Sequence, residues 1–169
     1  MWRWPSSIAL AVVVFGCGRG GAVREPAKEP AASAPELTPF ELTNGIGPIT
    51  REVTVGPLDH ALAERGKTLF ETKCSACHKM AERYVGPALG RVTERRSPAY
   101  IMNMILNPEG MYTRHPVAKQ LLAEYLTQMP NLGVTQDEAR AVLEYLREQA
   151  GKQGDDKTTT SRRPSLHEE

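Results

Sequence analysis

Two thiols and an imidazole lie within five residues, in the run Cys74-Ser75-Ala76-Cys77-His78. This spacing is the signature of c-type haem attachment. In that chemistry each thiol adds across one vinyl group at the edge of the haem, and the next residue supplies an imidazole, a common metal ligand, to one face of the iron. The motif therefore predicts one covalent haem c, attached through Cys74 and Cys77 and ligated by His78.

Other chemistries also use a Cys-x-x-Cys pair. A thioredoxin-like redox couple requires a βαβ setting, and no such pattern surrounds this pair. A structural zinc site requires a second pair of ligands, whereas the only other cysteine is Cys17, far upstream. A chance coincidence is the remaining alternative. Haem attachment is favoured because residues further along the chain also fit it.

The motif is accompanied by further marks in a fixed order. These marks are Gly66, Phe70, Gly86-Pro87-Ala88-Leu89, Met129-Pro130 and Tyr145. Together, between about Leu58 and Ala150, they resemble the class I cytochromes c, which are small, mostly helical electron carriers. The resemblance implies an all-α fold, with helices packed around one covalently bound haem, and a protein that is not an enzyme.

The same resemblance assigns roles to two residues outside the motif. Met129 precedes Pro130 in a stretch before the last expected helix, which is the place of the second axial ligand. Thioether ligation raises the reduction potential of a haem. The carbonyl of Pro87 is expected to accept a hydrogen bond from the other ring nitrogen of His78, which fixes the ring and makes it more basic.

Alternative ligands remain open. Met111 is the second choice of methionine, while Met80, Met102 and Met104 are expected to be bystanders. His60 and His115 would give bis-histidine ligation, although a histidine at a helix start is more often a surface residue. An iron without a second protein ligand would instead suit a peroxidase or a gas-binding sensor. A haem subunit of a larger respiratory complex would show the same sequence marks.

The chain of 169 residues divides by composition into four parts. We expect a signal peptide over 1–17, a Pro- and Ala-rich linker over 18–57, the haem domain over 58–150 and a disordered tail over 151–169. The apolar residues between Leu37 and Pro57 predict an extended collar that lies against the domain. Lys and Arg number 21 against 20 Asp and Glu, a balance that gives no reason to propose nucleic acid as a partner.

The first 17 residues have the pattern of an export signal. Ile8 to Phe15 form an apolar run that is too short to span a bilayer. The run ends in Val14-Phe15-Gly16-Cys17, which resembles the lipobox of bacterial lipoproteins and predicts a lipid on Cys17. The expected location is the bacterial periplasm, with a membrane anchor. Gly18 stands where some inner-membrane lipoproteins have Asp, and its presence favours the outer membrane. The alternative to lipidation is ordinary signal-peptide cleavage, which would leave a soluble periplasmic protein.

Helix boundaries are marked by capping residues. Asp59 predicts a helix from about His60 to Cys74, and Ser97-Pro98 predicts one that stops before Asn107. His115-Pro116 begins another. The capping-box pattern of Thr135 to Glu138 opens the last helix, which is expected to end at Gly151.

The resemblance implies a monomeric carrier that exchanges single electrons with other redox proteins. The donor would be a quinol-oxidising complex or another cytochrome, and the acceptor a terminal reductase or oxidase, such as nitrous oxide reductase. Lys73 and Lys79 flank the motif and are candidates for steering a partner. The haem propionates need donors, and the candidates are Arg91, Arg95, Arg96, Tyr84 and Tyr112.

Overall fold

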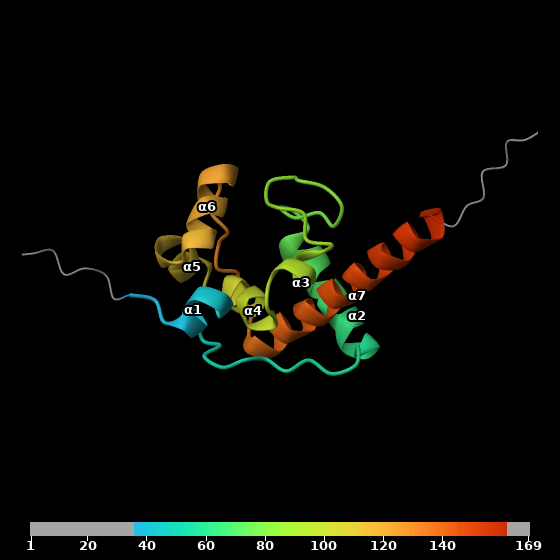
Figure 1. Cartoon of the computed structure of the whole chain (residues 1–169), viewed down its shortest axis with the longest axis horizontal. Coiled ribbons are helices and arrows are strands. Elements are labelled where there is room, and N and C mark those ends of the chain that lie inside the picture. Colours follow the sequence, from blue (N-terminus) through green and yellow to red (C-terminus); the bar gives the residue numbers. More distant parts are fainter. Residues whose placement is uncertain (1–35, 162–169) are drawn as a thin grey trace, which may run out of the picture. The chain divides into compact units, whose positions relative to one another are not determined.

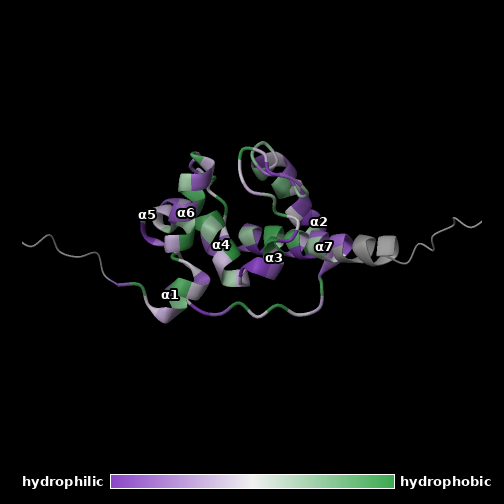
Figure 2. Ribbon diagram, turned by 45° about the horizontal axis from the view of Figure 1, so that its top comes forward, coloured by the Kyte–Doolittle hydropathy of each residue, from purple (hydrophilic) through white to green (hydrophobic). Residues whose placement is uncertain are grey.

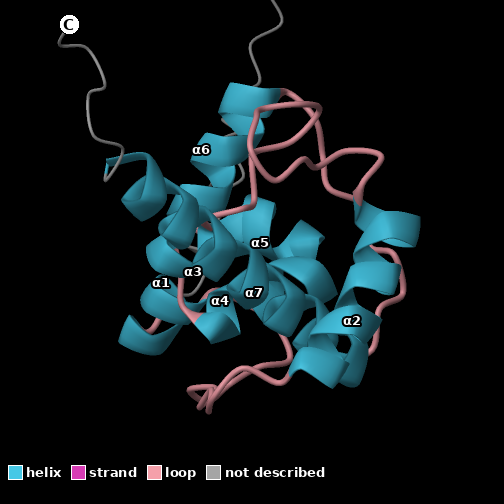
Figure 3. Cartoon of the chain, turned by 90° about the vertical axis from the view of Figure 1, so that its right-hand side faces the viewer, coloured by secondary structure: helices cyan, strands magenta, loops and turns pink. Residues whose placement is uncertain are grey.

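The computed structural model describes residues 36–161, and this part of the chain is helical throughout, without a strand (Figure 3). The fold-class prediction is therefore confirmed for these residues. In chain order the elements are α1 (Pro39–Asn44), α2 (His60–Leu69), the π-helical turn η1 (Phe70–Cys74), α3 (Val92–Arg95), α4 (Pro98–Leu106), α5 (Pro108–Arg114), α6 (Pro116–Tyr125) and α7 (Gln136–Ser161) (Figure 1). Residues 1–17, with Cys17, lie outside the described range.

Helices α2 and α7 cross at a glycine (Figure 1). A Cβ atom on Gly66 would lie 1.9 Å from the carbonyl oxygen of Ala141, so only a glycine permits this approach. One turn further on, the rings of Phe70 and Tyr145 pack with their centroids 5.4 Å apart and their planes inclined by 50°. This crossing holds α2, and with it the Cys-x-x-Cys-His run that follows, against the last helix.

Three helix starts follow the predicted caps. The Asp59 carboxylate accepts the amide of Leu62 at 2.9 Å, and the Ser97 hydroxyl accepts the amide of Tyr100 at 3.1 Å. At α7, Thr135 and Glu138 form the reciprocal capping box, with bonds of 2.8 and 3.3 Å. Each cap satisfies amides that the first helical turn leaves free.

The first predicted helix changes geometry before it reaches the motif. The sequence was expected to form one continuous helix to Cys74, but α2 ends at Leu69 and the last five residues form η1. The amide of Ser75 donates to the carbonyl of Phe70 at 2.9 Å, a π-type bond that widens the turn. Such π turns often occur at functional sites.

The segment before α2 lies against the domain, but it is not extended throughout. Thr38 and Glu41 form a capping box, with Pro39 at the first helical position, and so begin α1 where an extended collar was predicted. Beyond α1 the chain is extended along α4 and α7 (Figure 1). The Asn103 side chain, which is fully buried, donates to the carbonyls of Asn44 and Ile49 and accepts the Ile49 amide, all within 2.9–3.0 Å.

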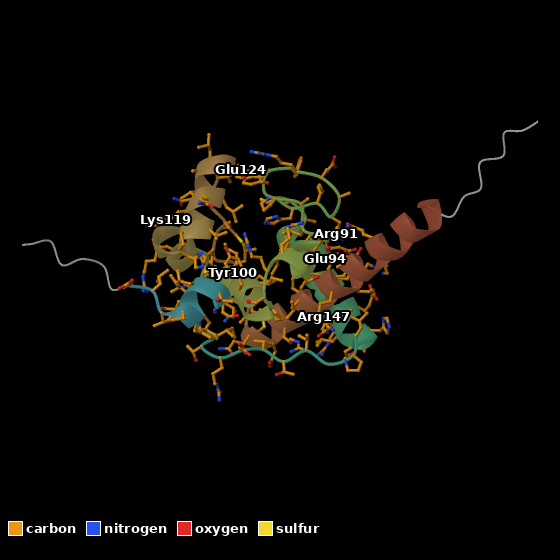
Figure 4. All side chains as sticks on the ribbon, in the orientation of Figure 1. Arg91, Glu94, Tyr100, Lys119, Glu124 and Arg147 are labelled. Atoms are coloured by element: carbon orange, nitrogen blue, oxygen red, sulfur yellow. The ribbon has the colours of Figure 1, made fainter. Side chains whose placement is uncertain are left out.

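The same segment is held by a buried charge on α7. The Glu144 carboxylate is 1% exposed and pairs with Arg140 at 2.7 Å and Arg147 at 2.6 Å. These two arginines also donate to the carbonyls of Thr54 and Gly56, so the buried acid positions both cations over the extended segment. Arg147 is labelled on α7 in Figure 4.

Two helical stretches differ from the sequence-based expectations. The helix that begins at Ser97-Pro98 was expected only to stop before Asn107, but a further helix, α5, begins directly afterwards at Pro108, where the Asn107 side chain caps it and Met111 is fully buried. Helix α7 was expected to end at Gly151, with a disordered tail over 151–169, yet it continues to Ser161. Lys152 pairs with Glu148 across Gly151 at 2.7 Å; residues 162–169 lie outside the described range.

Apolar side chains form two clusters. The larger joins Phe70 to residues of α4 and α7, and the smaller joins Ile46, Tyr100, Met111 and Ala118. Helix α4 contributes residues to both clusters, and its ribbon is largely hydrophobic (Figure 2). Within the described range no helix is both long and apolar enough to cross a membrane.

Candidate haem site

The two thiols are presented by a tight turn directly after η1. The amides of Cys77 and His78 both donate to the carbonyl of Cys74, at 3.0 and 2.9 Å. Both thiols are free and half-buried. Burial raises the pKa of the Cys74 thiol, with Lys73 opposing and Cys77 reinforcing the rise. Both cysteines line the same wall of the site.

The backbone of the loop that follows the motif orients the His78 ring. Its Nδ1 lies 3.0 Å from the carbonyl oxygen of Pro87, which can only accept, so this nitrogen carries the proton. Burial lowers the pKa of His78, while the bond to Pro87 works against this shift. The ring is therefore neutral and leaves Nε2 as the available lone pair, the form in which imidazole binds metals. The structure thus places Pro87 where the resemblance implied.

The approach of Pro87 depends on the glycine before it. A Cβ atom on Gly86 would lie 2.6 Å from Cε1 of His78, well inside contact distance. The Gly86 amide in turn donates to the carbonyl of Cys77 at 2.8 Å. This bond joins the loop after the motif to the motif itself, so the loop packs against the Nδ1 side of the imidazole.

A cavity of about 400 Å³ opens beside the motif. Cys74, Cys77, His78 and Met129 all line it. The remaining walls are mainly apolar side chains of α4, α6 and α7, among them Ile101, Ile105, Leu121, Leu122, Val142 and Leu146. Of the described residues that line the cavity none is Asp or Glu, whereas Lys73, Arg95 and Arg96 are cationic.

These residues fit a haem. The size and apolar lining are those of a small-molecule pocket, and two cysteines and a histidine line it. A thioether is available from a different segment, and cations without acidic neighbours suit the two carboxylates that a haem carries. No group of three or more His, Cys, Asp or Glu side chains gathers between residues 36 and 161, so the motif is not part of a larger zinc-type ligand set there.

The methionines separate into cavity residues and core residues. Met129 and Met104 both line the cavity, and Met104 also packs against the smaller cluster. Met111 does not: it is fully buried in the smaller cluster, and its sulfur accepts the amide of Ile46 at 3.0 Å. Met102 is buried in the larger cluster.

Neither alternative histidine lies at the cavity. His60 is exposed at the start of α2, with Nδ1 3.1 Å from Glu148. His115 was expected at the surface but is buried, with Nε2 3.2 Å from the carbonyl of Leu42 and its ring packed edge-on against Tyr100. A helix start is buried here because α1 and Tyr100 of α4 pack against it, which local sequence does not reveal.

The segment that carries Met129 is lightly held. It begins after Leu126, the one described non-glycine residue with positive φ (52°), and it passes through Gly133, whose φ is 62°. Lys73 donates to the carbonyl of Leu132 at 3.3 Å, and the Asn131 side chain accepts the amide of Gly133 at 3.0 Å. Few bonds therefore restrain this side of the cavity, in contrast to the His78 side.

One ion pair joins the loop behind His78 to the helix before Met129. Arg83 contacts the Glu124 carboxylate at 3.1 Å and donates to the Glu124 carbonyl at 2.9 Å. Its guanidinium also lies 4.1 Å from the ring centroid of Tyr125. Figure 4 shows Glu124 on α6 beside this loop. The contact links the loop after the motif to α6, two segments that border the cavity.

The residues predicted to contact the haem carboxylates or a redox partner differ in their own partners and in whether they line the cavity. Arg91 pairs with Glu94 at 2.6 Å and does not line the cavity, and Tyr84 is also outside it. Arg95, Arg96 and Tyr112 do line it. Lys73 donates to the carbonyl of Leu132 at 3.3 Å, as above, and Lys79 donates to that of Ser75 at 3.0 Å. Both lysines thus have intramolecular partners.

An all-α domain that gathers two thiols, an imidazole and a thioether around one apolar cavity has the features of a c-type haem protein. The sequence pattern of the Cytochrome c family matches residues 63–150, more than half of the chain. The chain therefore belongs to the cytochrome c family. Its cofactor is haem c, bound covalently through the motif that contains Cys74 and Cys77, and the family consists of electron carriers rather than enzymes.

Individual relatives agree with this assignment. A cytochrome c-553-like protein of Synechocystis sp. is 32% identical over 69 residues, which cover 38% of this chain and 66%, just under two thirds, of that relative. A solved cytochrome c from Rhodothermus marinus has a TM-score of 0.64 and 51% identity, covering 68% of this chain and 99% of its own. An engineered form of that protein, Rma TDE, has a TM-score of 0.63 and 50% identity over the same shares.

Proposed function

We propose that the protein is a membrane-tethered carrier of single electrons in the bacterial periplasm, with His78 and Met129 as the axial ligands of its haem c. The observation that carries the proposal is that imidazole and thioether line one apolar cavity although they are 51 positions apart in the chain. When bound, haem c supplies the one-electron change between ferric and ferrous iron. The chain supplies the ligands and a cavity with mainly apolar walls.

Each residue has a separate task in this proposal. The Pro87 carbonyl fixes the orientation and tautomer of His78, which keeps Nε2 directed away from the carbonyl. The apolar side chains of α4, α6 and α7 exclude water, so few solvent dipoles must reorganise around a change of charge. Met129 raises the reduction potential relative to a ligand that donates more strongly.

Location and partners are proposed from the sequence. The lipobox-like run at Cys17 supports a lipid anchor in the periplasm, with the outer membrane favoured. The donor would be a quinol-oxidising complex or another cytochrome, and the acceptor a terminal reductase or oxidase, for which nitrous oxide reductase is one choice to test. The carrier is proposed to act as a monomer, with encounters that depend only weakly on salt because the acids Glu71 and Glu82 lie close in sequence to Lys73 and Lys79.

The test is an optical comparison of the haem-matured wild type with two variants. Met129→Ala removes the proposed ligand, and Met104→Ala is the matched control because it removes a thioether from the same cavity. The wild type and Met104→Ala are expected to show a methionine-to-ferric-iron charge-transfer band and to bind no carbon monoxide when reduced. Met129→Ala is expected to lose the band and to bind carbon monoxide.

The opposite result has a definite meaning. If the wild type lacks the band and binds carbon monoxide rapidly, the second axial position is open and a gas-binding role replaces electron transfer. If Met104→Ala rather than Met129→Ala loses the band, the electron carrier stands but the ligand is wrong.

A further inference from the structure

The segment between α1 and α2 lies behind two of the helices that form the cavity wall. We call residues 45–57 the collar segment. Figure 1 shows it below α4 and the first half of α7, whereas α6 and the loop after the motif lie above these helices. No residue of the collar segment lines the haem cavity, but both α4 and α7 contribute side chains to its wall. Any influence of the collar segment on the haem is therefore expected to pass through these two helices.

The collar segment and the haem cavity share one apolar cluster. The larger cluster receives Ile49, Val53 and Val55 as partly buried neighbours from the collar segment. Members of the same cluster on α4 and α7 also line the cavity, namely Ile101, Ile105, Val142 and Leu146. A close-packed interior has few voids that could absorb a displacement, so it transmits strain from one side to the other. Loosening of the collar segment is therefore expected to loosen the cavity wall.

A side-chain amide bonds the collar segment to the outer face of α4. Asn103 is fully buried and forms three hydrogen bonds of 2.9–3.0 Å with the backbone of Asn44 and Ile49. Ile101 and Ile105 are each two residues from Asn103, and they lie on the opposite face because each residue turns a helix by about 100°. The helix therefore contacts the collar segment with one face and lines the cavity with the other.

The outer face of α7 is bonded to the collar segment in a similar way. Two arginines of α7 donate to carbonyls of the collar segment at 3.3 and 2.8 Å, namely Arg140 to Thr54 and Arg147 to Gly56. The buried Glu144 carboxylate pairs with both guanidinium groups. Val142 and Leu146, each two residues from Glu144, line the cavity on the opposite face of the helix. The collar segment therefore joins the outer faces of two helices whose inner faces form the cavity wall.

We propose that the collar segment positions the wall of the haem cavity by holding α4 against α7, and that it thereby restricts the entry of water and small ligands. The inference rests on the proposed function in so far as both require haem in this cavity. Asn103 is then a positioning residue, which acts through α4 and does not itself line the cavity. The competing role is that the collar segment only adds stability to the folded domain, in which case its loosening would leave the haem properties unchanged.

The test is Gly47→Ala in the haem-matured full-length protein. The new Cβ would overlap Oδ1 of Asn103 and lie 2.9 Å from its Cγ, and Asn103 cannot turn away without losing its bonds to the collar segment. Gly56→Ala is the matched control, because it adds the same methyl group to the same segment with no atom within 4 Å of the new Cβ. Neither glycine has a positive φ, so the overlap is the main difference between the two substitutions.

Two properties of the haem are measured under conditions in which all three proteins are fully folded. Gly47→Ala is expected to bind cyanide about tenfold more tightly in its oxidised form, because overpacking at the collar segment makes the closed wall less stable relative to an open one. Its reduction potential is expected to fall, because water that enters the cavity favours the more highly charged ferric haem. Gly56→Ala is expected to match the wild type in both properties.

Two results would overturn the inference. If Gly47→Ala has a lower unfolding midpoint but the cyanide affinity and reduction potential of the wild type, the collar segment only adds stability. If Gly47→Ala and Gly56→Ala change the haem equally, the contact with Asn103 is not the cause. If Gly47→Ala does not mature, Asn107→Asp replaces it: this change keeps the oxygen that caps α5 and removes the donor to the Ile46 carbonyl at 3.1 Å. Wild-type haem properties in that variant count against the inference.

The two proposals fail in different ways. Loss of covalent haem, or of the methionine–iron band, in the wild type refutes the proposed function. Unchanged cyanide affinity and reduction potential in Gly47→Ala, with haem and band intact in the wild type, refute only the role of the collar segment.

Discussion

Replacing Gly66 by alanine tests the contact on which the domain is built. The new Cβ would lie 1.9 Å from the Ala141 carbonyl oxygen and 2.9 Å from the Val142 amide nitrogen. Both atoms are backbone and cannot rotate away, so α2 and α7 must separate by roughly 1 Å or more to relieve the overlap, and overpacking of this kind costs about 1–3 kcal/mol or more.

A second effect acts in the opposite direction. Alanine is about 0.8–1 kcal/mol better than glycine inside a helix. The overlap involves the backbone of the neighbouring helix and therefore exceeds this gain. We expect Gly66→Ala to lower the free energy of unfolding by about 2 kcal/mol, and the separated helices to loosen the packing of Phe70 on Tyr145.

Gly151→Ala provides the matched control, because it is the same substitution within α7. No atom lies within 4 Å of the position its Cβ would take, and its φ is outside the left-handed region. Helix propensity alone then acts, and the variant is expected to gain about 0.5–1 kcal/mol. If α7 instead ended at Gly151 in a left-handed cap, alanine would destabilise the protein.

The assay is urea unfolding of the haem-matured proteins, followed by far-ultraviolet circular dichroism, with midpoint and slope compared. A Gly66→Ala protein as stable as the wild type would refute the close crossing. A Gly151→Ala protein that is less stable would refute the continuation of α7 beyond that residue. Because the two variants are expected to shift in opposite directions, a general effect of added methyl groups cannot account for the result.

Two further predictions concern the segment before α2 and the charge on α7. Asn103→Ala removes three hydrogen bonds to the backbone of Asn44 and Ile49. It is expected to lower the free energy of unfolding in urea by about 2–4 kcal/mol and to speed proteolysis between residues 45 and 57. Equal protease resistance of the variant and the wild type would contradict the docking of that segment. Hydrogen bonds from Lys152, first, and then from His60 lower the pKa of Glu148 below its usual value. The contribution of the Glu148 carboxylate to folding stability is therefore present above the unfolded pKa of about 4.3, and it is lost as pH falls through the lower folded pKa. Glu148→Gln is therefore expected to lose a few tenths of a kcal/mol at neutral pH and nothing once the carboxyl is protonated in both states, and an equal loss at pH 7 and pH 2.5 would contradict the ionic origin.

Features that depend on neighbours in sequence were predictable. The caps at Asp59, Ser97 and Thr135 act within three residues, so the starts of α2, α4 and α7 could be found without knowledge of the fold. The Cys-x-x-Cys-His run is equally local, because covalent attachment and ligation require adjacent residues.

Features decided by burial could not be found in this way. Met111 is fully buried in the smaller apolar cluster, and His115 is buried where it contacts α1. Met104 and Tyr100 lie one helical turn apart on α4, and only the placement of α4 beside the motif shows that both line the cavity. Gly66, Phe70 and Tyr145 were marks of the resemblance, whereas only the structure shows that a Cβ atom on Gly66 would lie 1.9 Å from the Ala141 carbonyl oxygen.

The two sides of the haem cavity differ in how firmly they are held, and this difference has a functional consequence. Behind His78, three backbone amides, those of Gly86, Leu89 and Gly90, donate to carbonyls of Cys77, Lys79 and Met80 at 2.8–2.9 Å, and Pro87 fixes the ring. Around Met129, one lysine and one asparagine hold the segment from Leu126 to Gly133. Local opening requires least free energy where the fewest buried contacts must break. Under the proposed ligation by His78 and Met129, ligand exchange would therefore be expected to begin on the Met129 side of the cavity. The electron-carrying state depends on the less restrained side remaining closed, and the Arg83–Glu124 contact, which joins the two sides, favours that closed state.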